Sequence, residues 1–359
     1  MPVTIRGLGV VLVAVLVAPA TAQKRNADRP AGARYEGRAF DFKKIAEGVF
    51  LAAGTGNLSA ESNAVIVVND HDVLVVDGET SPAAGWALMK ELRSITAKPV
   101  RYLVISHFHY DHAHGTQFFP PGIEIIGTEF TRRMLAEGKS LSHPTAAGNR
   151  TFSAAQISNL TKALDTASTP AGRKDIEKRR MVWQEYVASI ATITPVPPNV
   201  TVTDRMTLTR GGREIVIFHP GPAHTAGDLV VWLPKERILA TGDMLQPNLP
   251  YLGDGFIQQW TTALDSLKAL APAVILPGHG DPITDLAVLD HLRDYLRDLW
   301  TQSVALKQEG LAFAEAAKRL DLTKYDAYYP RFPGWTDEMV ARRRAGSVKR
   351  VYDLVDGLK

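Results

Sequence analysis

The first half of the chain alternates short apolar, β-branched runs with apolar residues at helical spacing. The apolar runs predict strands at residues 62–68, 73–76, 100–105 and 124–126. The first strand signals lie near Val49, and a helical pattern that includes Trp86 and Leu92 covers residues 83–94. This order predicts a mixed α/β fold that opens with hairpins.

Residues 139–195 break this alternation with two helical patterns. The four residues from Ser153 to Gln156 have the form of a capping box, which predicts that a first helix begins there. Apolar residues from Ile176 to Ile190 recur at the spacing of a second amphipathic helix, and prolines from Pro195 onward end it. We therefore expect a helical insertion in the sheet-forming part of the chain.

Strand patterns resume after the insertion. They predict strands at residues 206–209, 214–219, 229–233, 238–241 and 274–276. Helical patterns follow at residues 256–270 and 285–308, and the remaining residues are mostly helical and basic near Arg342–Arg344. We therefore expect the chain to end in a helical C-terminal extension, residues 286–359.

The N-terminus has the order of a secretory signal peptide. Arg6 precedes an apolar, uncharged run from Gly7 to Ala20, and Ala20-Thr21-Ala22 is a small-residue cleavage site. The alternative is a membrane anchor, but the run is shorter than the ~20 residues that span a bilayer. We expect cleavage after Ala22, a periplasmic or secreted protein without stable membrane insertion, and a flexible polar arm over residues 23–44.

Composition narrows the classes of function. The 359 residues carry 41 Lys and Arg against 38 Asp and Glu, a net charge of +3, and no dense basic stripe that would favour nucleic acid. The apolar fraction of 45% fits a folded protein rather than a disordered one. The absence of cysteine excludes disulfides, thiolate zinc sites, iron–sulfur clusters and cysteine nucleophiles.

The candidate chemistry lies in the histidines. Four metal-binding side chains, His107, His109, Asp111 and His112, fall within six positions at the end of a predicted buried strand. Side chains two apart in an extended segment point the same way, so His107 and His109 can reach one ion, while the turning chain aims the other two at a second. Imidazole and carboxylate ligands suit zinc, and also iron or manganese.

Three later residues occupy similar places just beyond strands. They are His224 in a His-Thr-Ala-Gly context, Asp243 after Gly242, and His279 between Gly278 and Gly280. Added to the first cluster, they are enough for two metal ions. The other histidines lack a motif context: we expect His71, His143, His219 and His291 to lie outside the site, and we expect at most a supporting role for His114.

The pattern H-x-H-x-D-H, then His224, Asp243 and His279, resembles the metallo-β-lactamase superfamily over about residues 45–285. The resemblance implies an αββα sandwich with the metals at one edge between two sheets, here with a helical insertion and a helical C-terminal extension. It assigns His107, His109 and His224 to one metal and Asp111, His112 and His279 to the other. Asp243 would bridge both ions, and Asp77 would support the histidine loop.

The function that follows is that of a dinuclear zinc hydrolase. A metal-bridging hydroxide would attack an acyl C–O, C–N or C–S bond in an ester, lactone, thioester or β-lactam, and Asp111 would orient it and move a proton. Asp243 stands where the β-lactam-hydrolysing members carry Cys or Ser, so the chain looks more like glyoxalase II and the lactonase-like branch. The alternatives are an iron-dependent oxidoreductase similar to persulfide dioxygenases, and a non-catalytic metal-binding module.

The sequence also bears on the partners and on the lining of the pocket. We expect a small-molecule substrate, no nucleic acid, and self-association, if any, as a homodimer through the C-terminal extension. The insertion and the extension are expected to shape or cover the pocket or to form a dimer surface. Aromatic residues are the candidates for the pocket lining, with core packing as the alternative: Tyr251, Phe256, Trp260, Tyr328, Tyr329 and Trp335.

Overall fold

Two β-sheets packed face to face form the centre of the molecule in the computed structural model, which describes residues 28–332 and 335–358. The expected signal segment, residues 1–22, lies outside the described residues. The larger sheet has the strand order β1 (Phe40–Ala46), β2 (Val49–Gly54), β3 (Ala64–Val68), β4 (Val73–Val76), β5 (Val100–Val104), β6 (Glu124–Gly127) and β7 (Val200–Thr201). The smaller sheet has the order β12 (Val274–Pro277), β11 (Ile238–Gly242), β10 (Val230–Leu233), β9 (Arg213–Phe218) and β8 (Arg205–Arg210).

Alternating side chains of the strands build the layers. In β3, Val65 and Val67 face the other sheet, whereas Ile66 between them packs on the opposite side. In β9, Ile217 faces the larger sheet and Val216 faces away from it. Because successive side chains of a strand point to opposite faces, strands that are apolar at every position must be covered on both sides.

Helices supply this cover, which confirms the predicted αββα sandwich. The outer face of the larger sheet packs on α1 (Pro82–Glu91), and that of the smaller sheet on α7 (Ile257–Ala269) and α8 (Ala287–Gln308). The connections also contain α2 (Tyr110–Ala113), α3 (Glu129–Ala136), and the 3-10 turns η1 (Leu92–Ser94) and η2 (Thr116–Phe118).

The expected flexible arm over residues 23–44 is wrong for the part that the structure describes. Its last residues belong to β1, which pairs antiparallel with β2, so the strands begin earlier than Val49. Tyr35 Oη donates to Glu91 Oε1 of α1 at 2.8 Å, and Phe40 is fully buried. The strand escaped detection because β1 is an edge strand whose lysines face solvent, so its own sequence lacks a strong apolar pattern.

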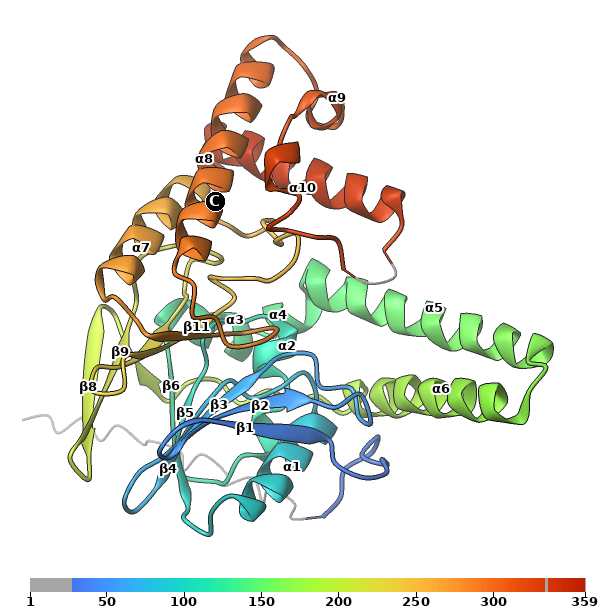
Figure 1. The fold of residues 1–359 in the computed structure, drawn as a ribbon, viewed down its shortest axis with the longest axis vertical. Helices are drawn as coiled ribbons and strands as arrows, with labels where there is room; N and C mark the ends of the chain where they lie inside the picture. Colours follow the sequence, from blue (N-terminus) through green and yellow to red (C-terminus); the bar gives the residue numbers. More distant parts are fainter. Residues whose placement is uncertain (1–27, 333–334, 359) are drawn as a thin grey trace, which may run out of the picture.

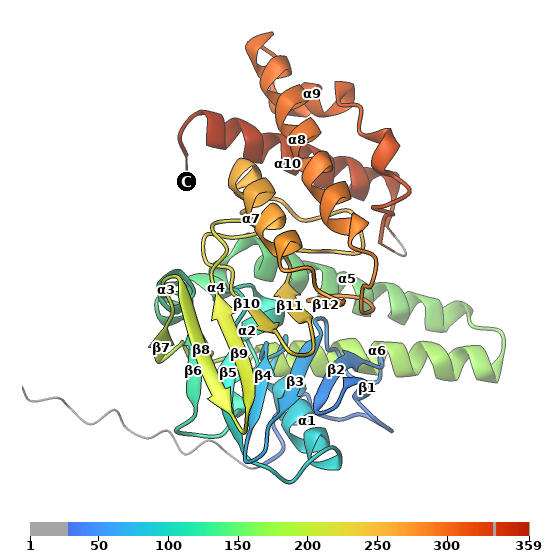
Figure 2. The same ribbon diagram turned by 60° about the vertical axis from the view of Figure 1, so that its left-hand side comes forward.

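The helical insertion consists of α4 (Lys139–Ser142), α5 (Pro144–Thr166) and α6 (Pro170–Ile190). The predicted start of its first long helix at Ser153 is wrong. α5 begins at Pro144 with His143 as its N-cap, and Ser153 Oγ donates to the Asn149 carbonyl inside the helix at 2.8 Å. α5 and α6 pack against each other and extend from the sandwich as a hairpin (Figures 1 and 2).

The C-terminal extension is helical, as its pattern predicts. After α8 it contains α9 (Phe313–Arg319), η3 (Thr323–Tyr325) and α10 (Asp337–Val355), which gather beyond the smaller sheet (Figure 1). Leu296 of α8 and Val348 of α10 share one apolar core with Trp260 of α7. Among the described residues, no helix combines the length and apolarity that a membrane crossing requires.

Candidate metal centre

The H-x-H-x-D-H motif lies where the chain leaves the buried strand β5. His107 and His109 are in the extended connection, and Asp111 and His112 are on the short helix α2. Behind the motif, the chain passes so close to its neighbours that a Cβ on Gly115 would lie 2.7 Å from the Ser81 carbonyl oxygen. Only glycine allows this approach, which fixes α2 against the loop after β4.

Three histidines converge at one side of the site; we call them the three-histidine group (His107, His109, His224). His109 Nδ1 lies 3.0 Å from His107 Nε2 and 3.1 Å from His224 Nε2, and all three rings are buried. Burial holds the pKa of His107 well below its ordinary value and lowers that of His224 to about 3. Neutral imidazoles that point nitrogens at one spot are the donor set of a divalent metal.

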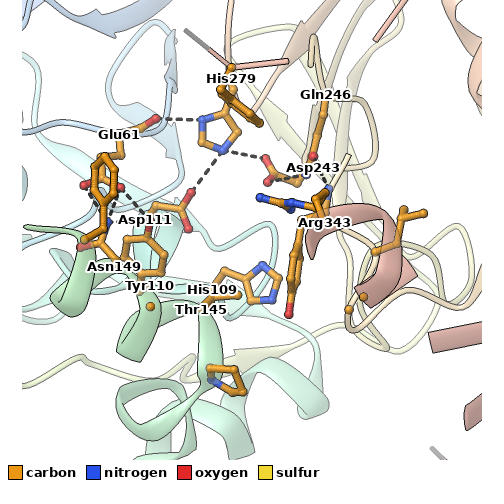
Figure 3. A pocket seen from close by; sticks show the side chains of 18 of the residues that line it. Glu61, His109, Tyr110, Asp111, Thr145, Asn149, Asp243, Gln246, His279 and Arg343 are labelled. Atoms are coloured by element: carbon orange, nitrogen blue, oxygen red, sulfur yellow. Dashed lines mark hydrogen bonds and ion pairs between the residues drawn. The ribbon is translucent and has the colours of Figure 1, made fainter. Parts of the chain in front are cut away.

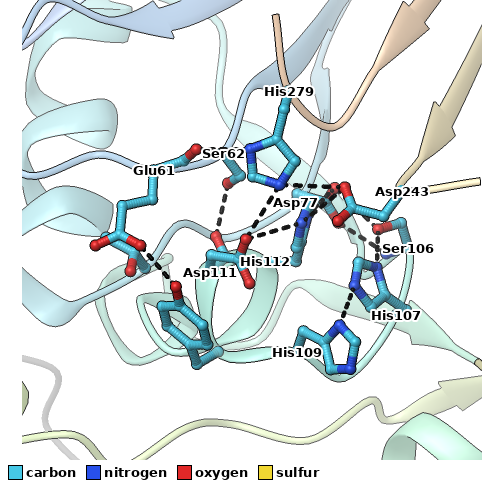
Figure 4. Close-up of polar contacts among 12 residues, drawn as sticks. Glu61, Ser62, Asp77, Ser106, His107, His109, Asp111, His112, Asp243 and His279 are labelled. Carbon is cyan, nitrogen blue, oxygen red and sulfur yellow. Dashed lines mark hydrogen bonds and ion pairs between the residues drawn. The ribbon is translucent and has the colours of Figure 1, made fainter. Parts of the chain in front are cut away.

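Four further side chains form a second group beside it, the mixed group (Asp111, His112, Asp243, His279). His279 Nε2 lies 3.2 Å from Asp111 Oδ2 and 3.3 Å from Asp243 Oδ1. Asp243 Oδ2 is also 3.8 Å from His224 Nε2, so this carboxylate stands between the two groups (Figure 4). The structure thus brings together all seven side chains that the sequence singles out.

Electrostatics and unpaired atoms both favour a cation at the mixed group. Burial opposes ionisation of Asp111 and Asp243, but His112 and His279 outweigh it and hold both carboxyl pKa values well below the ordinary range. His112 Nε2 and Asp243 Oδ1 are buried and lie 3.2 Å apart, but neither makes a well-oriented hydrogen bond among the described residues. Buried donors and acceptors are rarely left unpaired, so the residues present fit a metal ion.

Hydrogen bonds behind the two groups orient the ligand atoms. Asp77 Oδ2 lies 2.8 Å from His112 Nδ1, and Asp77 also accepts from the amide and hydroxyl of Ser106. The predicted supporting position of Asp77 is therefore what the structure has. His279 Nδ1 lies 2.8 Å from the Glu61 carbonyl oxygen. Such contacts on the far nitrogen fix the ring tautomer so that Nε2 faces the metal position.

Sequence reasoning missed two residues at the site, Asp254 and His143. Asp254 Oδ2 lies 2.9 Å from His109 Nε2, and its Oδ1 lies 3.1 Å from His143 Nε2. Burial opposes ionisation of Asp254, but His109 and His143 outweigh it and lower its pKa. The expectation that His143 lies outside the site is wrong, because the start of α5 carries it to the Asp254 loop. No local signal marks this pair, since the two residues are far apart in sequence.

The remaining histidines lie away from the two groups. His114 is buried with Nε2 3.2 Å from Ser140 Oγ, and burial lowers its pKa to about 4. His71 is exposed in the β3–β4 turn, and His219 Nδ1 lies 2.7 Å from the Asp228 carbonyl oxygen. His291 stacks on Tyr328 with ring centroids 3.6 Å apart. The expectation that His71, His219 and His291 lie outside the site therefore agrees with the structure.

The aromatic candidates divide between the pocket and the core. Tyr251 and Trp335 line the cavity over the metal centre, and the Tyr251 ring lies 5.7 Å from that of His109. Trp260 packs edge-on to the buried face of His224 and belongs to the core, as does Tyr329. Phe256 lies under Arg350, and Tyr328 stacks on His291 instead of lining the pocket.

The cavity has a volume of about 750 Å³ and is lined by the insertion and the extension together with the sandwich (Figure 3). The insertion contributes Thr145, Asn149, Phe152 and Trp183, and the extension contributes Trp335, Met339 and Arg343. Glu61 braces one wall by accepting hydrogen bonds from Tyr110 Oη at 2.7 Å and Asn149 Nδ2 at 2.9 Å. The expectation that both added segments shape the pocket thus agrees with the structure.

Comparison with known sequences identifies a family pattern across most of the sandwich. The profile of the metallo-beta-lactamase superfamily matches residues 60–124 and 151–279, more than half of the chain. A linear primary-alkylsulfatase from Pseudomonas sp. is 25% identical over 269 residues, which cover 72% of this chain and 49% of that protein. A metallo-beta-lactamase type 2 from Bacteroides fragilis is 36% identical over 93 residues, which cover 24% of this chain and 37% of that protein.

Solved structures agree on the fold. A stereoselective inverting sec-alkylsulfatase from Pseudomonas sp. superposes with a TM-score of 0.58 at 17% identity, covering 89% of this chain and 51% of that one. A metallo-beta-lactamase from Pontibacter korlensis superposes with a TM-score of 0.51 at 19% identity, covering 72% of this chain and 99% of that one. The chain spans about half the length of the alkylsulfatases it matches.

Proposed function

The chain belongs to the metallo-β-lactamase superfamily, and from that premise we propose that it is a dinuclear zinc hydrolase of small molecules. The bond cleaved is an acyl C–O, C–N or C–S bond. The observation that carries the proposal is the convergence of seven nitrogen and oxygen donors in two adjacent buried groups, with Asp243 between them. A chain released from catalysis need not keep every donor in register.

The three-histidine group would hold one ion and the mixed group the other. This set of imidazoles and carboxylates without thiolate suits zinc, with iron or manganese as the other candidates. Two divalent cations supply acidified water and stabilise negative charge on the oxygen of the bond under attack. Asp77, the Glu61 carbonyl and Asp254 keep the donor nitrogens of His112, His279 and His109 aimed at the metal positions.

Asp111 is the residue that moves the proton in this proposal. Its Oδ2 lies 3.4 Å from His112 Nε2 and 3.2 Å from His279 Nε2, and the residue lines the cavity. The lowered pKa keeps the carboxylate ionised at neutral pH, so it can accept a hydrogen bond from the attacking water and orient it. The proton that the water loses as its oxygen bonds to the substrate passes by way of Asp111 to the leaving group.

A second candidate is hydrolysis of a sulfate ester. The observation that favours it is the reach of the structural match: the sec-alkylsulfatase superposes on 89% of this chain, whereas the Pontibacter β-lactamase superposes on 72%. Part of the cavity wall comes from the extension, so the shape of the substrate pocket depends on a region that a minimal sandwich lacks.

Metal content is the first test. Protein purified without added metal should contain about two zinc ions per chain, since the structure offers two donor groups. Asp243→Asn should lower that content and abolish turnover, whereas Asp281→Asn, at an almost fully exposed carboxylate, should change neither. A single iron per chain would overturn the hydrolase and favour the oxidoreductase, to be followed by oxygen-consumption assays with thiol and persulfide substrates.

A substrate panel then separates the two hydrolytic candidates. Esters, lactones, thioesters and β-lactams test acyl cleavage, and primary and secondary alkyl sulfates test the second candidate. Turnover of a member of the first set that is lost in Asp111→Asn supports the proposal. Turnover of alkyl sulfates alone replaces it with the sulfatase. No turnover above metal-free protein on any compound contradicts both candidates and favours a non-catalytic module.

A further inference from the structure

Arg343 of α10 enters the cavity between two aromatic rings. Its guanidinium carbon lies 5.1 Å from the centroid of the Tyr251 ring and 5.0 Å from that of Trp335. Tyr251 in turn lies 5.7 Å from the ring of His109 and 6.1 Å from that of His224. One aromatic ring therefore separates the guanidinium from the three-histidine group, within the same cavity (Figure 3).

The guanidinium of Arg343, a partly buried residue, has no anionic partner among the described residues. Its Nη1 is buried without a hydrogen bond, and no carboxylate among the described residues lies within ion-pair distance of it. Burial lowers the pKa of Arg343, which reflects the cost of holding this charge away from water. The carboxylates of the cavity do not compensate it, since Asp111 and Asp243 face histidines and Glu61 accepts from Tyr110 and Asn149.

The neighbours of Arg343 on the same helix are paired. Arg342 contacts Glu338 at 3.3 Å, and Arg344 contacts Asp326 at 2.8 Å. Arg350 donates from Nε to the Gly255 carbonyl at 2.9 Å. These three guanidinium groups thus have partners within the protein, whereas Arg343 has no anionic partner at the cavity wall. An anion that enters the cavity could supply one.

We propose that Arg343 binds an oxyanion of the substrate, a carboxylate or a sulfate, at a site separate from the bond that is hydrolysed. The two flanking rings hold the planar guanidinium at the cavity wall, and they offer apolar contact to the part of the ligand that links its two ends. The proposal rests on the proposed function only in that the ligand is the substrate; anion binding at Arg343 stands or falls separately.

Isothermal titration calorimetry on purified protein that retains its native metal tests the binding step. The probes are benzoate and benzenesulfonate, with neutral benzamide as the matched control ligand. Arg343→Met should weaken binding of the preferred anion roughly 10- to 100-fold, because charged hydrogen bonds are lost. Arg343→Lys should retain part of the affinity, and Arg344→Met, the same change on the outer side of α10, should retain all of it.

The comparison of the two anions identifies which oxyanion the site prefers. Any affinity contributed by the metals is common to all variants, so the difference between Arg343→Met and Arg344→Met isolates the guanidinium. Equal anion affinity in the wild type and Arg343→Met, with unchanged thermal melting, would overturn the proposal. So would benzamide binding as tightly as either anion. If Arg343→Met unfolds at a lower temperature than the wild type, Arg343→Lys is used in its place, and an anion affinity equal to that of the wild type would contradict the proposal.

Kinetics with two esters, one anionic and one neutral, test the anion site separately from the proposed hydrolase activity. Mono-p-nitrophenyl succinate carries a free carboxylate, and p-nitrophenyl butyrate is a neutral ester of similar length. Arg343→Met should raise KM for the first ester and leave the second unchanged. If neither ester is hydrolysed but anion binding still depends on Arg343, the acyl-hydrolase proposal loses support and the anion site remains. Equal effects on both esters would contradict a charge-reading role.

Discussion

Asp254 contacts the ring nitrogen of His109 that faces away from His107 and His224, with Asp254 Oδ2 and His109 Nε2 2.9 Å apart. This contact ties the loop before α7 to the histidine motif after β5, and the turned ring presents Nδ1 to His107 and His224. Orientation of one metal-facing nitrogen therefore depends on a carboxylate from the other half of the sandwich.

Asp254→Asn should weaken zinc binding at the three-histidine group by roughly 10- to 100-fold. The amide can still accept one hydrogen bond, but it lacks the charge that holds the His109 ring and raises its basicity. Competition with a zinc chelator measures the affinity. Asp281→Asn is the control, and equal affinities in the two variants would show that Asp254 has no such role.

Gly115→Ala should lower the free energy of unfolding by about 1–3 kcal/mol, because the new methyl group overpacks the loop behind the metal centre. A Cβ at this position would lie 2.7 Å from the Ser81 carbonyl oxygen and 3.1 Å from the Gly85 Cα. Gly148→Ala, within α5 and with nothing within 4 Å of its Cβ, should be neutral or slightly stabilising. Urea denaturation of both variants checks the difference, and comparable losses in both would contradict the packing argument.

Asp228 gives stability a pH dependence that can be isolated by substitution. Burial raises the pKa of this carboxyl to about 7, against hydrogen bonds from the Thr225 amide and hydroxyl. The folded state then holds a proton that the unfolded chain releases near pH 4, so the free energy of unfolding falls as pH rises from about 4 to about 7.

Asp228→Asn should remove this contribution, which is on the order of 1 kcal/mol per pH unit within that window. Unfolding of wild type and variant at several pH values measures it, since the difference between the two curves cancels the other titrating groups. A difference that stays constant between pH 4 and pH 7 would show that Asp228 ionises normally in the folded protein.

Truncation after residue 285 should yield insoluble protein, although both sheets would be complete. Trp260 and Leu264 of α7 pack against Leu296 and Leu299 of α8, and all four side chains are almost fully buried. Removing α8 exposes this apolar face to water. Removal of residues 356–359 alone should leave a soluble protein, as judged by size-exclusion chromatography. A monomeric 1–285 form with a cooperative melting transition would contradict the shared core.

Local patterns in the sequence were sufficient for most strands and helices and for the seven converging side chains, and the family resemblance supplied the layers. The strand from Val73 to Val76 is apolar at every position, which identifies it as buried. In the motif from His107 to His112, the local backbone sets the relative directions of side chains a few positions apart, so their convergence could be predicted. The family match over residues 60–124 and 151–279 confirms the family that these motifs indicate.

The predictions that were wrong had two causes. A local motif was misleading because the tertiary structure does not use it, or a segment had no local pattern and depends on its tertiary contacts. Ser153 to Gln156 has the form of a capping box, but α5 already begins at Pro144, so the serine lies inside a helix. β1 has too few apolar residues to be predicted as a strand from its own sequence, and it is a strand because it pairs with β2.

The sequence by itself determined most strands and helices and the seven residues that converge, because these depend on short-range order along the chain, and the αββα class followed from the family that their motifs resemble. Only the tertiary structure decided that His143 meets Asp254, and that Arg343 enters the cavity unpaired while Arg342 and Arg344 find carboxylates. These relations join the insertion, the sandwich and the extension. Their physical reason is the packing of separate elements, which no spacing within one segment encodes.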